Sequence, residues 1–249
     1  MSVVDDSFDH PLKLEEEGTV PLAGGILQHG YQCGMLWGTA LAAGAEAYER
    51  FGPGPQAEAA AITAAQRLVE SFRARNGSID CLELTGVDWQ NLSMQVVAKY
   101  FITGRVTRCF GMAGKYATVA FDEINATLSE EYVEVPSPPV SCAAMQARKM
   151  GVSEMHAVMA AGFAGGIGLC GGACGALGAA IWIITMNNRK EGASKMDFEN
   201  PRAKAAIGRF LKCTDDEFKC SKIVGRRFES VGDHAEYISK GGAWKLLKC

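Results

Sequence analysis

Two glycine-rich stretches, AGGILQHGYQCGML at residues 23–36 and AGGIGLCGGACGAL at residues 164–177, decide the fold of this 249-residue chain. Eight of their fourteen positions are identical without a gap, and the identities include Cys33 with Cys174. Self-similarity of this kind indicates that one structural unit occurs twice in a chain. The remaining sequence is therefore expected to contain two copies of that unit.

The spacing of the cysteines extends the repeat well beyond these stretches. The second cysteine follows the first after 48 residues in one copy and 46 in the other, and the third follows the second after 28 and 29 residues. The cysteines concerned are Cys33, Cys81 and Cys109 in the first copy, and Cys174, Cys220 and Cys249 in the second. Three cysteines that recur in the same order predict a tandem duplication with pseudo-two-fold symmetry.

Helix-forming residues dominate both copies, and alternating β-branched runs are scarce, so we predict an all-α fold. Asn200 followed by Pro201 is typical of a helix start. Small residues such as Gly44 and Gly178 predict close approach of helix backbones. The helices are expected over residues 31–51, 55–75, 92–103, 109–131, 142–165, 172–188, 200–213 and 233–247.

The chain is expected to divide into four parts. Residues 133–140 (VEVPSPPV) form a proline-rich connector that cannot continue a helix. The connector separates a first repeat, 21–132, from a second repeat, 141–249, and residues 1–20 form an N-terminal tail.

Composition excludes several partners and locations. A net charge of −3 without a Lys/Arg-rich run gives no electrostatic footprint for nucleic acid or an anionic membrane. Residues 157–188 carry no charge, but the glycines within them predict two buried helices joined by a turn rather than a membrane span. The acidic N-terminus lacks the pattern of a secretory signal, so we expect a cytoplasmic protein.

Nine cysteines are a high count for a reducing compartment, where thiols serve as small core residues, metal ligands or redox centres. The tight C-x-x-C pairs of zinc ribbons and ferredoxins do not occur, nor does a C-x-x-C-H haem-attachment sequence. In the ungapped alignment Cys170 falls on His29, and both are metal-ligand types. The candidate ligands are therefore His29, Cys33, Cys81 and Cys109 in the first copy, and Cys142, Cys170, Cys174, Cys220 and Cys249 in the second.

The residues alone leave three functions open. The cysteines could hold a metal or iron–sulfur cluster, could cycle between dithiol and disulfide, or could only pack in a structural helical subunit. Cys213 has no counterpart in the other copy, so we interpret it as a packing residue. No nucleophile constellation can be argued from the four histidines, and the catalytic residues stay unknown.

The second copy resembles a known family, the redox-active proteins named for their C–GCAxxG–C–C cysteine pattern. The resemblance is carried by VSCAAMQARKMG with Cys142, by GFAGGIGLCGGACGALGA with Cys174, and by Cys220 and Cys249. The family core appears here as ACGALG, residues 173–178, with Gly and Ala exchanged around the cysteine. The first copy looks like the same unit without its leading cysteine. The family is also similar to the cysteine unit of split-Soret cytochromes.

This resemblance implies a helical redox protein that holds an iron–sulfur cluster, of a type not specified, for electron transfer. It implies metal ligation by Cys142, Cys174, Cys220 and Cys249, and a second site at Cys33, Cys81 and Cys109. We expect an electron-transfer protein or an oxidoreductase subunit with a redox partner protein. A homodimer and a place in a larger redox complex both stay open.

Overall fold

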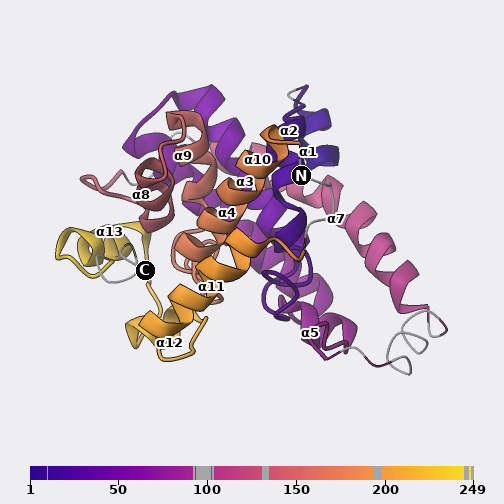
Figure 1. The fold of residues 1–249 in the computed structure, drawn as a ribbon. Coiled ribbons are helices and arrows are strands. Elements are labelled where there is room, and N and C mark those ends of the chain that lie inside the picture. The colour runs from indigo at the N-terminus through magenta and orange to yellow at the C-terminus, as the bar shows by residue number, and fades with distance from the viewer. Residues whose placement is uncertain are drawn as a thin grey trace.

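A computed structural model describes residues 1–9, 11–91, 93, 102, 104–130, 135–192, 198–243 and 247. These residues form helices and two isolated bridges but no strand (Figure 1), which confirms the predicted all-α class. The elements are α1 (Ser2–Ser7), α2 (Lys13–Gly18), η1 (Val20–Leu22), α3 (Gly34–Phe51), α4 (Pro55–Asn76), α5 (Cys81–Thr85), α7 (Arg105–Leu128), α8 (Cys142–Lys149), α9 (Glu154–Ala161), α10 (Gly175–Lys190), α11 (Pro201–Cys213), α12 (Cys220–Val224) and α13 (Val231–Ser239).

Most predicted helices lie where the sequence placed them, with one clear exception. The single helix expected over 142–165 is wrong, because the structure divides it into α8 and α9. Gly151 between them has a left-handed φ of 75°, which ends the first helix. The Ser153 side chain then accepts a hydrogen bond from the His156 amide and starts the second. The helix expected over 92–103 lies almost entirely outside the described residues.

The start of α11 follows the predicted signal. The Asn200 side chain accepts hydrogen bonds from the amides of Arg202 and Ala203, and Pro201 occupies the first helical position. Proline has no amide hydrogen to leave unpaired there, so this sequence both caps and aligns the helix.

The core is built around α3, which packs against α4 and α9. Small residues allow the backbones to approach closely, as predicted: a Cβ on Gly44 would lie 2.5 Å from Met159 Cα, and one on Gly162 would lie 3.1 Å from the Ala40 carbonyl. Larger side chains at these positions would force the helices apart.

Equivalent residues of the two copies meet in the middle of the molecule. The Gln32 side chain bonds Ala173, its counterpart 141 residues later. A Cβ on Gly178 would lie 2.3 Å from the ring of Trp37, its counterpart in the first copy. Contacts between equivalent residues are those expected at a two-fold axis. They support the tandem arrangement predicted from the sequence.

The predicted N-terminal tail contains two helices that pack on the core. α1 contacts α3 and α7, and Val4 is buried. α2 packs on α10, where the Trp182 indole N–H donates to the Glu15 carbonyl at 3.0 Å. The tail therefore contributes to the core.

Among the described residues, no helix combines the length and hydropathy needed to cross a membrane. The uncharged stretch 157–188 instead belongs to α9 and α10, joined by a glycine-rich turn, as predicted. In Figure 1 the short helices α5 and α12 both lie at the lower end of the molecule, one from each copy.

Candidate functional site: two groups of thiols

A short antiparallel bridge joins two cysteine-bearing segments in the first half. The Cys33 amide donates to the Ile79 carbonyl at 2.8 Å, and the Cys81 amide donates to the Tyr31 carbonyl at 2.7 Å. Two cysteines separated by 48 residues are thus held on paired backbone segments.

The second half repeats both hydrogen bonds. The Cys174 amide donates to the Phe218 carbonyl at 2.8 Å, and the Cys220 amide donates to the Gly172 carbonyl at 2.7 Å. The repeat seen in the sequence therefore recurs in the backbone that positions the thiols.

Five helices of the described chain begin at a cysteine. Cys33 and Cys174 are the N-caps of α3 and α10, and the first residues of α5, α8 and α12 are Cys81, Cys142 and Cys220. A helix N-terminus presents free amides and a positive dipole end, which favour a thiolate. The amide of Met35 accordingly acts to lower the pKa of Cys33, and the amides of Leu177 and Ala176 act to lower that of Cys174.

The first thiol group consists of Cys33, Cys81 and Cys109. Burial, together with the smaller effect of negative charge on Cys81 and Cys109, raises the pKa of Cys33 to about 12. Burial also raises the pKa of Cys81, and negative charge on Cys109 raises it in the same direction. A hydrogen bond with the Trp89 side chain acts to lower it. Cys33 thus lies close enough to feel the charge of both other thiols, and Cys81 feels that of Cys109. α7 supplies the third member, Cys109, which is half-buried.

The second thiol group consists of Cys142, Cys174 and Cys220, all buried. Burial raises the pKa of Cys142 to about 12, with a further contribution from Cys174. Burial likewise raises the pKa of Cys220, and the charges of Cys174 and Cys142 add to the effect. Tyr237, from α13, feels the charge of all three. The two groups therefore match in composition and in position within the repeat.

Three other predicted ligands have different surroundings. Cys170 lies beside the second group, where its charge contributes to the raised pKa of Cys220, and its thiol donates to the Gly166 carbonyl at 2.7 Å. The His29 ring packs against Phe218, with centroids 4.9 Å apart. Cys249 lies outside the described residues.

The interpretation of Cys213 as a packing residue is wrong. This cysteine is half-exposed and disulfide-bonded, whereas the other seven described cysteines are free thiols. It belongs to neither thiol group.

Gln32 links the two groups and was missed by the sequence reasoning. Its side chain is fully buried; it donates to the Gly166 carbonyl and accepts from the Ala173 amide, both at 2.9 Å. Gln32 precedes Cys33, and Ala173 precedes Cys174, so this contact connects the two cysteine segments directly. The alignment of the two copies contained a signal for this role. Gln32 aligns with Ala173, so one copy has a long polar side chain where the other has a small apolar one.

Replacing Gln32 by alanine should destabilise the fold by about 3 kcal/mol, because it leaves a cavity and removes the hydrogen-bond partner of the buried Ala173 amide. Urea unfolding followed by circular dichroism would measure the change. Gln56→Ala is the matched control, since Gln56 is exposed at the start of α4 and its loss should cost less than about 0.5 kcal/mol. Equal unfolding midpoints for the two variants would contradict the structural role of Gln32.

The thiol groups differ in geometry from a site for one ion. Within the described ranges, no three His, Cys, Asp or Glu side chains are arranged to hold a single metal ion. Tetrahedral zinc, with Zn–S bonds of about 2.3 Å, requires sulfurs about 4 Å apart. The described thiols are therefore not placed to hold a single zinc ion.

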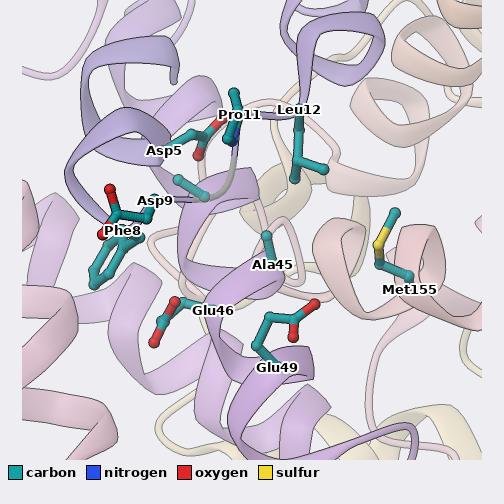
Figure 2. Close-up of a pocket in the computed structure, with 10 residues that line it drawn as sticks. Asp5, Phe8, Asp9, Pro11, Leu12, Ala45, Glu46, Glu49 and Met155 are labelled. Atoms are coloured by element: carbon teal, nitrogen blue, oxygen red, sulfur yellow. The ribbon is translucent and has the colours of Figure 1, made fainter.

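An acidic cavity of about 210 Å³ lies apart from both thiol groups, between the N-terminal segment and α3 (Figure 2). Asp5, Asp9, Glu46 and Glu49 line it together with apolar side chains. Burial raises the pKa of Asp5 to about 8. The lining contains no cysteine, so this cavity is not part of the thiol sites.

Comparison with known proteins agrees with the duplicated arrangement. A family model described as "Putative redox-active protein (C_GCAxxG_C_C)" matches the chain in two segments, residues 3–122 and 140–242. The segments fall on the two copies, and each contains one of the thiol groups. No curated protein and no solved structure matches the chain.

Proposed function

Because the chain belongs to the C_GCAxxG_C_C family, which is described as redox-active, we propose that it transfers electrons through iron–sulfur clusters held by its two thiol groups. One observation carries the proposal: in each half, the same pair of backbone hydrogen bonds holds two cysteine segments together, and a third helix supplies another thiol whose charge acts on the pair.

The surroundings of the thiols support an anionic cofactor. Ligation requires thiolates, and burial alone disfavours them, as the raised pKa values of Cys33 and Cys142 show. Bound iron would supply the compensating positive charge, and the N-termini of α3, α8 and α10 would stabilise the remaining negative charge. Backbone amides near the sulfurs, such as those of Met35 and Leu177, would tune the reduction potential.

Clusters of the common types take four cysteine ligands. In the second half Cys170 lies beside the group, and Cys249 is the other candidate for the fourth ligand. In the first half His29 is the nearest candidate in sequence, or a partner protein could complete the set. The cofactor would accept and return single electrons in exchange with a redox partner protein. We expect this exchange to take place in the cytoplasm.

Thiol–disulfide cycling is the competing function. The paired backbone segments bring Cys33 towards Cys81 and Cys174 towards Cys220, as such cycling would require. However, exchange begins with a thiolate that can reach solvent, and burial raises the pKa of all four thiols. We therefore place the cluster function first.

A spectroscopic experiment separates the two functions. Full-length protein purified without oxygen should absorb visible light, lose this absorption on reduction with dithionite and recover it on reoxidation. The thiol–disulfide function predicts a colourless protein that loses free thiols in pairs on mild oxidation. A colourless, metal-free protein would refute the cluster proposal.

A further inference from the structure

A surface cavity of about 380 Å³ lies where the cysteine segments of the two halves meet. Its wall includes Asp80, which precedes Cys81, and Gly172, which lies two residues before Cys174. Lys219 and Ser221, on either side of Cys220, line it too. Cys170 also contributes to the wall. The cavity therefore borders backbone segments that position both thiol groups.

The lining is positively charged, although the protein as a whole carries a net charge of −3. Four cationic side chains and two carboxylates line it: Arg73, Lys219, Lys222 and Arg227, with Asp80 and Glu83. Lys219 lies 3.7 Å from Asp80, and the Ser78 hydroxyl donates to Glu83 at 2.5 Å. Among the described residues, no carboxylate forms an ion pair with Arg73, Lys222 or Arg227. Four cations against two carboxylates leave the lining with an excess of two positive charges.

Two of these cations converge on one point. Arg73, near the end of α4, and Arg227, after α12, line the cavity together with Cys170. A Cβ on Gly171 would lie 3.1 Å from Arg227 Nε, so the arginine packs over this glycine. The neighbouring Arg226 instead makes two hydrogen bonds of 2.7 Å to Asp233. Arg227 is thus oriented towards the cavity without a carboxylate partner.

We propose that this cavity binds a small molecule bearing an oxyanion of the phosphate class. Guanidinium groups suit such an anion because their planar donors match its oxygens, and Lys222 adds a third charge. The volume lies within the usual range for small-molecule sites. The bound molecule would lie beside both thiol groups. That it donates or accepts electrons rests on the proposed function, whereas its binding to the cavity does not.

The test is a titration of the full-length protein with inorganic phosphate at low ionic strength, followed by the ³¹P NMR line width. We expect saturable binding, weakened at least about tenfold in the double variant Arg73→Gln/Arg227→Gln. Arg75→Gln is the control, because it removes one positive charge from an exposed position of α4 outside the cavity. It should leave binding unchanged.

A second readout does not depend on charge neutralisation alone. Phosphate should slow modification of the exposed Lys222 by an amine-reactive reagent, measured by peptide mass spectrometry, in the parent protein and in Arg75→Gln but not in the double variant. Absence of saturable binding, or equal loss in the double variant and in Arg75→Gln, would overturn the proposal. Phosphate binding by a protein that lacks iron would leave this site standing while refuting the cluster function.

Discussion

Replacing Cys174 and Cys220 together by alanine is expected to remove all iron and sulfide from the second half while leaving the cofactor of the first half in place. Both residues hold the same bridge and contribute two of the three thiols in the second group, and the remaining ligands cannot anchor a cluster. The corresponding variant of Cys33 and Cys81 should show the reverse pattern. Iron and acid-labile sulfide per chain, measured after anaerobic purification, would report both losses.

Gln56→Ala is the control for this pair of variants, because Gln56 is exposed at the start of α4 and lies outside both thiol groups. It should retain the full iron content. Far-UV circular dichroism should show the helical fold in all variants, since alanine in place of a buried thiol removes only one small atom. Undiminished iron in Cys174→Ala/Cys220→Ala would mean that these residues do not hold the cofactor.

Replacing Gly175 by alanine is expected to destabilise the protein by more than about 3 kcal/mol. The new Cβ would lie 1.8 Å from the Phe163 carbonyl oxygen and 2.5 Å from its carbon, and neither backbone atom can move away by a side-chain rotation. Gly175 is also the first residue of α10 and follows Cys174, so relief of the clash would displace the thiol. Urea unfolding of the reduced protein would measure the loss.

Two further glycines calibrate this prediction. Gly34 is the counterpart of Gly175 in the first half, where a Cβ would lie 2.9 Å from Ala23 Cα, so Gly34→Ala should be less damaging. Gly208 is exposed within α11, with nothing within 4 Å of an added Cβ. Gly208→Ala should therefore stabilise the protein by about 1 kcal/mol through helix propensity. Similar unfolding midpoints for all three variants would contradict the packing described here.

The sequence predicted the repeat and the helical class because a duplication preserves residue types at equivalent places. It also predicted which thiols belong to which half, since Cys33 and Cys81 recur as Cys174 and Cys220. The break between α8 and α9 was missed although Gly151 and Ser153 signal it, because the continuous run of helix-forming residues outweighed two local signals.

Other features depend on contacts between distant segments, which no local pattern records. The bridge between the two segments consists of the single residue pair Gln32 and Asp80. One residue in each segment is too short a pattern to predict a strand. The buried contact of Gln32 with Ala173 and the disulfide state of Cys213 arise from the tertiary fold. The cationic cavity likewise combines residues from both halves of the chain.

The central claim is that each half gathers its thiols around one iron–sulfur centre. Quantifying iron and acid-labile sulfide in full-length protein, purified and kept without oxygen, tests it most directly. The account predicts both elements in stoichiometric amounts, enough for one cluster in each half. Protein that is folded and fully reduced but contains neither iron nor sulfide, even after anaerobic reconstitution with both, would contradict it.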